Sequence, residues 1–297
     1  MKLLASILVA ATAIVPVLAQ EAASFAADAG NDYWIQPDVV YNVANNYQNK
    51  LDVIYPHDAK APVPAVIYIH GGGWVFGSKA GAVLETLPYL QMGWAAVNVE
   101  YRMASASNAP AAVEDCRCAL RWIVQNAKQY HIDPARLVVT GHSAGGHLAL
   151  MTGMLTEAAG LDNNCAEEGP EPHVAAIVNW YGITDVADLL SGPNRKTYAV
   201  DWLGGPPDRE AIARRVSPLT YVRKDLPPII TIQGSADPVV PYSHGVRLHE
   251  ALDKAGARNQ LFTVPGGGHG GFTDEWNRKA YEAIREFLGK YGLGAVR

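Results

Sequence analysis

Short apolar runs alternate with longer amphipathic stretches along most of this chain. Each short run is bounded by Gly, Pro or polar residues, which is typical of a buried strand, and each longer stretch repeats its apolar positions with helical spacing. The expected strands cover a hairpin at 39–55 and then 65–69, 95–100, 137–140, 175–182, 229–234 and 260–264; the expected helices cover 81–90, 111–130, a segment from 144, 242–255 and 274–291. This alternation predicts a mostly parallel twisted sheet with helices on both faces, the α/β class.

Three segments depart from the alternation. Residues 1–19 have one basic residue at position 2, continue as a short apolar run and end in small residues, which predicts a signal peptide. A retained anchor is the alternative for this segment, and the rest of the chain contains no comparable apolar run. Residues 20–38 are polar and rich in Ala, and we expect a poorly ordered arm. Residues 39–297 are expected to form a single domain, in which the insert at about 186–224 forms a small lid.

Charge and the N-terminal segment indicate which partners this protein can have and where it is located in or outside the cell. The formal net charge is −5 and basic residues do not cluster, which argues against nucleic acid as a partner. The signal peptide predicts a secreted or periplasmic protein with no membrane span in the mature chain. The oligomeric state is not predicted.

The sequence Gly141-His142-Ser143-Ala144-Gly145-Gly146 stands between an expected strand and an expected helix. Glycines two positions before and after a serine relieve crowding in a sharp turn that exposes the serine hydroxyl above the sheet. A hydroxyl becomes a good nucleophile once a neighbouring base takes its proton. The pattern therefore predicts Ser143 as a nucleophile, and an ordinary strand-to-helix turn is the alternative.

A second glycine-rich segment, His70-Gly71-Gly72-Gly73-Trp74, follows the expected strand at 65–69. Consecutive glycines are conformationally unfavourable and pack nothing, so they indicate a place where backbone N–H groups approach a ligand closely. In acyl transfer that ligand is the developing oxyanion. We expect the N–H groups of Gly72, Gly73 and Ala144 to form the oxyanion hole; a flexible loop is the alternative.

A base and an acid are needed to complete this chemistry. His269 follows the strand at 260–264 within a glycine-rich loop, and it is the predicted base. Asp237 follows the strand at 229–234, immediately before the histidine strand, and is the predicted acid. Asp185 is the competing acid, although it is better placed to cap a helix that starts near residue 186.

Three cysteines are an odd count, so at least one is unpaired within the chain. Cys116 and Cys118 lie on different faces of the expected helix at 111–130, and Cys116 shares the face that points to the core. Cys118 is free to reach Cys165, and an exported protein would permit that disulfide. Three free thiols are the alternative.

These motifs resemble the α/β-hydrolase superfamily, in particular the H-G-G-G esterases: the hormone-sensitive-lipase-like enzymes and the bacterial acetyl-xylan and feruloyl esterases. The resemblance extends over about 48–290 and includes the stretches 100–104 and 109–115. It implies an α/β-hydrolase catalytic domain, serine-dependent hydrolysis of carboxylic esters, and neither a metal nor an organic cofactor. The expected substrate is a small-molecule or polysaccharide-linked ester. Two departures favour the bacterial esterases: no long N-terminal helical cap is expected, and His142 replaces the usual aspartate before the serine.

Four aromatic residues follow the expected site loops and strand ends: Trp74, Trp180, Tyr181 and Phe272. Their positions predict an acyl pocket suited to a feruloyl ring or a sugar face, and ordinary core packing is the alternative. Other activities are compatible with the same residues: a prolyl-oligopeptidase-like peptidase, an amidase, or a binding protein that keeps the fold without catalysis.

Overall fold

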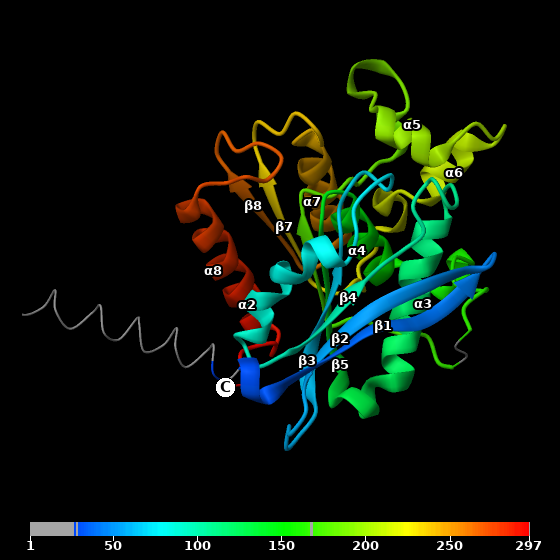
Figure 1. Ribbon diagram of the computed structural model, residues 1–297. Helices are drawn as coiled ribbons and strands as arrows, with labels where there is room; N and C mark the ends of the chain where they lie inside the picture. The colour runs from blue at the N-terminus through cyan, green and yellow to red at the C-terminus, as the bar shows by residue number, and fades with distance from the viewer. Residues whose placement is uncertain (1–26, 28, 167–168, 297) are drawn as a thin grey trace, which may run out of the picture.

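The chain folds around one mixed sheet with helices on both faces (Figure 1). The computed structural model describes residues 27, 29–166 and 169–296, and the sheet in this part of the chain has eight strands in the order β1-β2-β4-β3-β5-β6-β7-β8. The strands are β1 (Tyr33–Ala44), β2 (Tyr47–Pro56), β3 (Val63–Ile69), β4 (Ala95–Val99), β5 (Ile132–His142), β6 (Ala176–Trp180), β7 (Ile229–Gly234) and β8 (Asn259–Val264). The strands β3 to β8 are parallel to one another, while β2 is antiparallel to both of its neighbours.

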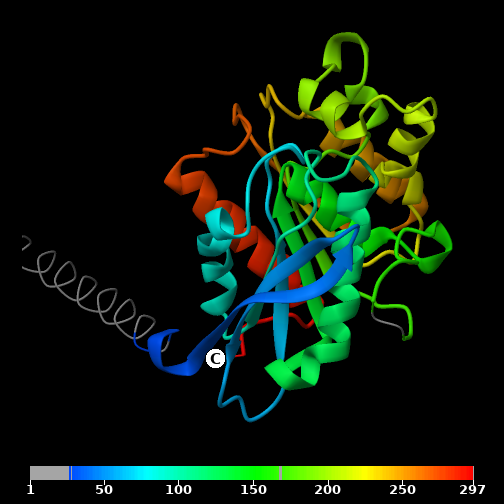
Figure 2. The same cartoon turned by 45° about the vertical axis from the view of Figure 1, so that its right-hand side comes forward.

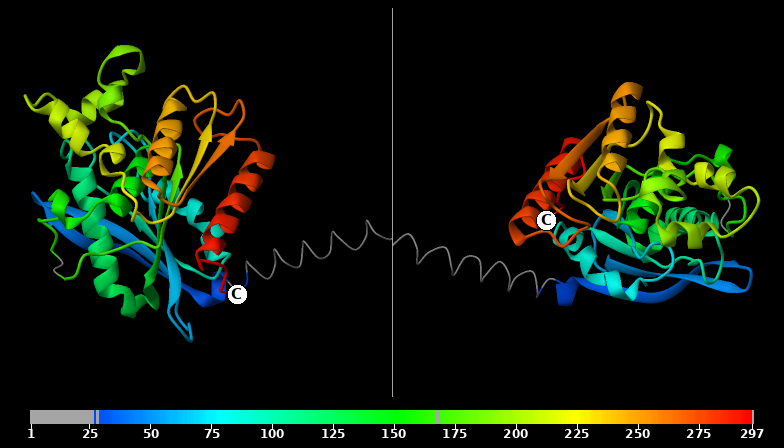
Figure 3. Two further views of the ribbon diagram at one scale, coloured as in Figure 1. Left: turned by 180° about the vertical axis from the view of Figure 1, so that it is seen from behind. Right: turned by 90° about the horizontal axis from the view of Figure 1, so that it is seen from above.

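Two helical layers sandwich the sheet, as Figures 2 and 3 show from other directions. The helices are α2 (Leu87–Leu90), α3 (Ala111–Asn126), α4 (Ala144–Met154), α5 (Thr197–Leu203), α6 (Arg209–Arg215), α7 (Ser243–Ala255) and α8 (Asp274–Lys290). Apolar residues of α3, α4, α5 and α7 belong to the core on one face, and those of α2 and α8 to the core on the other. This is the α/β-hydrolase fold that the sequence predicts.

The expected arm at 20–38 is wrong in its second half, because the first strand begins at Tyr33 rather than near Val39. Tyr33 pairs with Pro56, so β1 extends the hairpin by six positions beyond the expected start. The side chains of Trp34 and Ile35 are exposed, and the apolar alternation that reveals a buried strand is therefore absent. The register shifts between Gln36 and Val39, a type of irregularity that lets an edge strand accommodate a proline.

Two segments that were each expected to form one helix form two shorter helices in the structure. The segment expected at 81–90 forms a 3₁₀ helix, η1 (Ala80–Thr86), followed by the single turn of α2. The helix expected at 111–130 is α3, which ends at Asn126 and continues as a 3₁₀ turn to Tyr130.

The insert between β6 and β7 contains α5 and α6 and lies beyond the carboxyl ends of the parallel strands, at the top right of Figure 1. Asn108 ties it to the main body through hydrogen bonds to the carbonyls of Asp201 and Trp202, at 3.0 and 3.1 Å. The segment expected to form a lid is therefore helical and docked against the domain.

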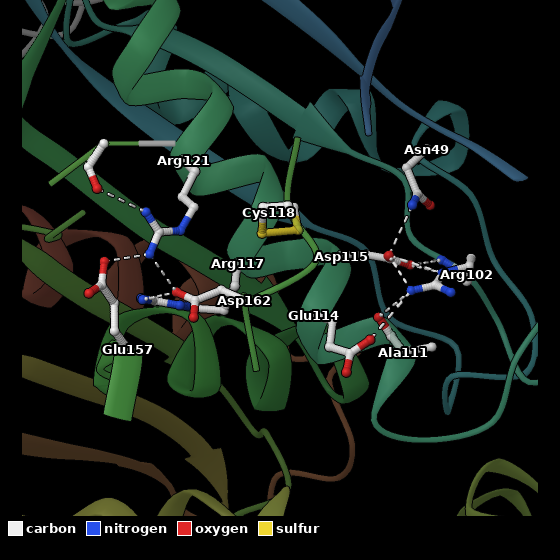
Figure 4. Close-up of a disulfide and its surroundings, with 12 residues drawn as sticks. Asn49, Arg102, Ala111, Glu114, Asp115, Arg117, Cys118, Arg121, Glu157 and Asp162 are labelled. Carbon is white, nitrogen blue, oxygen red and sulfur yellow. Dashed lines mark hydrogen bonds and ion pairs between the residues drawn. A yellow bond between two sulfur atoms is a disulfide. The ribbon is translucent and has the colours of Figure 1, made fainter. Parts of the chain in front are cut away.

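A disulfide joins Cys118 of α3 to Cys165, and Cys116 is a buried free thiol (Figure 4). Buried ion pairs lie beside the bridge. Asp162 accepts hydrogen bonds from Arg117 at 2.8 Å and from Arg121 at 3.1 Å, which neutralises an otherwise unfavourable buried charge. The segment around residue 162 is thus fixed to α3 by covalent and ionic contacts.

The predicted signal peptide at 1–19 lies outside the described residues. Over the part of the chain that the structure describes, no helix combines the length and the apolar character needed to span a membrane.

Candidate active site

Ser143 occupies a sharp turn between β5 and α4. Its φ of 56° and ψ of −119° are unusual for a residue other than Gly, and such backbone strain is typical of functional turns. The N–H of Ser143 donates to the carbonyl of Trp180 at 2.9 Å, which fixes the turn to β6. Gly145 has to be Gly, because any Cβ there would overlap the carbonyls of Ile69 and His70. The turn thus exposes Ser143 at the carboxyl end of the sheet.

His269 lies between Ser143 and Asp237. Its Nε2 is 2.8 Å from the Ser143 Oγ, and its Nδ1 is 2.8 Å from Oδ2 of Asp237. A carboxylate can only accept, so Nδ1 carries the proton and Nε2 is left free to accept the serine proton. The residues are 126 and 32 positions apart in sequence, and only the fold brings them together.

The Asp237 side chain is completely buried, and both of its carboxylate oxygens accept hydrogen bonds. Its Oδ1 accepts the N–H groups of Val239 and Val240 at 2.8 and 2.9 Å, leaving Oδ2 for the imidazole. The loops that carry the acid and the base are themselves joined, since Ala236 donates to the carbonyl of Gly267 at 2.9 Å. Asp185, the competing acid, is instead paired with Arg247 at 2.9 Å, away from His269.

The H-G-G-G loop lies against the serine turn, and a Cβ at Gly71 would be 3.7 Å from the Ser143 Cβ. Gly72 and Gly73 have φ of 115° and 58°, which L side chains rarely adopt. Among the described residues, neither of their N–H groups donates to another protein atom. Ala144 is the first residue of α4, so its N–H also lacks an intrahelical acceptor. Three backbone donors are thus available beside Ser143.

Side chains from distant segments hold this loop in place. Trp74 is buried, donates to Nδ1 of His147 at 3.2 Å, and stacks on Trp202 of α5 with ring centroids 4.1 Å apart. At the other end of the loop, His70 lies 2.9 Å from Glu100, which also accepts the N–H of Lys79. The donors are therefore preorganised by the insert and by the end of β4.

The four predicted pocket aromatics divide into two pairs. Trp74 and Trp180 are buried, which corresponds to the core-packing alternative, and they support the site from within the core. Tyr181 and Phe272 are partly exposed, and Tyr181 packs 4.6 Å from the His269 ring, between ring centroids. Tyr181 is thus next to the proposed base, and Phe272 packs edge-on against Tyr181 with ring centroids 6.1 Å apart.

Several neighbours were not anticipated from the sequence. Tyr198 of α5 packs against Gly73, and a Cβ on that glycine would be 2.9 Å from the Tyr198 Cβ. Tyr68 hydrogen-bonds His142 at 2.5 Å. Burial and the nearby His269 lower the pKa of His142 to about 3, so this imidazole is neutral. The sequence does place Tyr198 in the insert expected to cover the site, and its aromatic character was the signal that could have indicated a role there.

A parallel sheet that presents a strained serine, a histidine and an aspartate at its carboxyl edge, together with free backbone donors, defines an α/β-hydrolase. Comparison with known proteins specifies the family. Residues 51–252 match the BD-FAE family model, and the chain belongs to the BD-FAE family.

Curated relatives include Esterase LipC of Mycobacterium tuberculosis, which is 33% identical over 220 residues, or 70% of this chain and 53% of LipC. Esterase LipQ of the same organism is 27% identical over 76% of this chain and 55% of LipQ. The chain thus spans about half the length of these curated relatives.

Solved structures match over nearly their full length. A truncated carbohydrate esterase from gut microbiota has a TM-score of 0.76 and 29% identity, covering 88% of this chain and 96% of that chain. Thermogutta terrifontis esterase 2 phosphonylated by cyclosarin has a TM-score of 0.72 and 30% identity, covering 89% and 96%.

Proposed function

We propose that this protein is an exported serine carboxylesterase that hydrolyses carboxylic esters through an acyl-enzyme. The observation that carries the proposal is the continuous hydrogen-bonded line from the Asp237 carboxylate through His269 to the Ser143 hydroxyl. The esterases among the relatives and matching structures support the same reaction class.

In the proposed cycle His269 takes the proton of Ser143 as its oxygen attacks the ester carbonyl. The tetrahedral oxyanion is stabilised by the N–H groups of Gly72, Gly73 and Ala144, and each such donor contributes about 3–4 kcal/mol in comparable sites. His269 then gives its proton to the departing alcohol. Water, activated by the same imidazole, releases the acid and restores the serine. Asp237 holds the reactive tautomer throughout and stabilises the imidazolium.

Acetyl or feruloyl esters of plant polysaccharide are the proposed natural substrates. The structural match to a carbohydrate esterase supports an ester on a carbohydrate, and Thermogutta terrifontis esterase 2 with propionate bound supports a small acyl group. Tyr181 provides aromatic surface beside His269, and Phe272 extends that surface by packing against Tyr181. A small-molecule ester with the same acyl group is the simpler form of this substrate.

Export is supported by two observations. Residues 1–19 have the pattern of a signal peptide. The bridge between Cys118 and Cys165 is of a kind that persists in oxidising compartments and is rare in the cytosol.

The decisive experiment compares the wild type with Ser143→Ala on p-nitrophenyl acetate and on an aminoacyl anilide. We expect the wild type to hydrolyse the ester, and the folded Ser143→Ala variant to retain no measurable turnover. Ser191→Ala is the matched control, because Ser191 is exposed on the insert and is expected to leave activity unchanged.

A fluorophosphonate should label Ser143 in the wild type, with the site read by peptide mass spectrometry. Full activity in Ser143→Ala would refute the mechanism. Preferential cleavage of the anilide would favour the peptidase or amidase alternative, and absence of both activities would favour a binding protein.

A further inference from the structure

One side of the proposed nucleophile carries a group of polar side chains that the reaction itself does not use. Tyr68, His142 and Trp180 lie at the carboxyl ends of β3, β5 and β6, on the sheet face that α2 and α8 cover. Figures 1 and 2 both place α2 and α8 next to each other over this face. Glu85 of η1, the 3₁₀ helix that precedes α2, lies near His142, and Tyr281 of α8 lies against Trp180. The group is adjacent to Ser143 because His142 precedes it in the chain.

The His142 ring is held in one orientation. The Tyr68 hydroxyl is 2.5 Å from Nδ1, and the ring stacks on Trp180 with centroids 5.1 Å apart. A phenol is a stronger acid than a neutral imidazole, so the hydroxyl donates to Nδ1 and the remaining ring proton is on Nε2. Burial keeps this imidazole neutral because it lowers the pKa to about 3. His142 therefore presents a fixed N–H donor.

Glu85 is the acceptor opposite this donor. Its Oε2 is 4.0 Å from Nε2 of His142, which is too long for a direct hydrogen bond. The Glu85 side chain is 45% exposed and that of His142 is 19% exposed, so both can be reached from solvent. Tyr281 packs on Trp180 with ring centroids 5.2 Å apart and lies close enough to Glu85 for each group to affect the pKa of the other.

A hydroxyl group fits this gap. Two hydrogen bonds of about 2.8 Å that meet at one oxygen span 4.0 Å at an angle of roughly 90°. The oxygen would accept the N–H of His142 and donate its own proton to Glu85, which satisfies both groups at once. An apolar group in the same place would leave a carboxylate and an N–H unpaired, which is unfavourable.

We propose that His142 and Glu85 form a subsite that binds a hydroxyl group of the ester substrate beside the scissile bond. The inference rests on the proposed esterase activity and specifies its substrate class: esters that carry a free hydroxyl. That hydroxyl is either on a sugar ring in the alcohol part or on the aromatic ring of a hydroxycinnamoyl acyl part.

The test uses two matched pairs of esters. A monoacetylated methyl xyloside is compared with tetrahydropyranyl acetate, which keeps the ring and lacks the hydroxyls; methyl 4-hydroxycinnamate is compared with methyl cinnamate. The variants are Glu85→Ala and Glu85→Gln. Glu282→Gln is the control, because it removes the same charge from an exposed position of α8. The readout is the kcat/KM ratio within each pair, so a general loss of activity cancels.

We expect the wild type and Glu282→Gln to prefer the hydroxylated member of at least one pair. Loss of a hydrogen bond to a charged group should lower that preference about 10- to 100-fold in Glu85→Ala, and less in Glu85→Gln, which keeps an acceptor oxygen. A change in the xyloside pair places the hydroxyl on the alcohol, and a change in the cinnamate pair places it on the acyl group. Unchanged ratios in an active Glu85→Ala would overturn the subsite and leave the esterase assignment intact. A wild type that hydrolyses no ester would overturn the proposed function and the subsite with it.

Discussion

Removal of the bridge between Cys118 and Cys165 is expected to lower the free energy of unfolding by about 4 kcal/mol. The bridge closes a sequence separation of 47 residues that includes β5, Ser143 and α4. In the chain-entropy model a loop of this length loses about 13.6 cal/mol/K in the unfolded state, which corresponds to about 4 kcal/mol near room temperature. The perturbation is the double variant Cys118→Ala with Cys165→Ala.

The native state should tolerate this change. The ion pairs of Asp162 with Arg117 and Arg121 hold the same segment to α3, and they do not depend on the sulfur atoms. We therefore expect kcat/KM on p-nitrophenyl acetate within about twofold of the wild type, because the destabilisation acts mainly through the unfolded chain. Stability and activity should thus separate in this variant.

The measurement is equilibrium unfolding in guanidinium, followed by tryptophan fluorescence, for the oxidised wild type, the double variant and the wild type in reductant. Cys116→Ala is the control, because it removes a buried thiol and leaves the bridge intact. Thiol titration of the denatured wild type without reductant should find one free thiol. A double variant that unfolds within about 1 kcal/mol of the oxidised wild type would contradict the entropic reasoning, and three free thiols would show that the bridge does not form.

Three further predictions concern the site and the pH dependence of stability. Asp237→Asn should lower kcat on p-nitrophenyl acetate by about three to four orders of magnitude, because an amide no longer selects the reactive tautomer; a loss below about tenfold would contradict its role. Gly72→Ala should lower kcat about 100- to 1000-fold by displacing an oxyanion donor, since its Cβ would overlap a backbone carbonyl. Gly81→Ala should be neutral, because its Cβ would make only an ordinary contact with the Ser78 Oγ at 3.8 Å. Burial lowers the pKa of His142 to about 3 and of His147 to about 4, below the unfolded value near 6.5, so the unfolded chain binds more protons in acid. The free energy of unfolding should then fall as pH drops from about 6.5 to 4, by up to about 1.4 kcal/mol per pH unit for each histidine. Urea titrations that show a flat stability profile over this window would contradict the lowered pKa values of both groups.

Local signals in the sequence were enough for the class of fold and for the positions of the principal loops. The glycines around Ser143 and the three glycines after β3 are required because the backbone there passes too close to neighbouring atoms for a side chain. Only Gly meets this requirement, so the sequence reveals it. Strand and helix periodicity likewise predicted the α/β class with a mostly parallel sheet, since burial of one or both faces imposes a repeat on the chain; the α/β-hydrolase fold followed from the resemblance of the motifs.

The edge strand β1 is an element that local sequence signals did not predict in full. The start of β1 has exposed apolar side chains and pairs only with β2, while the Tyr33 hydroxyl donates to the carbonyls of Leu90 and Trp94, which are remote in sequence. Backbone pairing leaves no side-chain pattern, and the sequence therefore predicted an arm where a strand exists.

Contacts between distant segments were decided by the tertiary structure alone. Trp74 and Trp180 stand at a site loop and at a strand end, much as Tyr181 does, yet both are buried, because α5 and α8 cover them. His142 of β5 and Glu85 of η1 lie 4.0 Å apart, although no sequence pattern relates these two positions. Periodicity and turn chemistry are encoded over a few neighbouring residues, whereas the packing of a side chain depends on which remote element reaches it when the chain collapses.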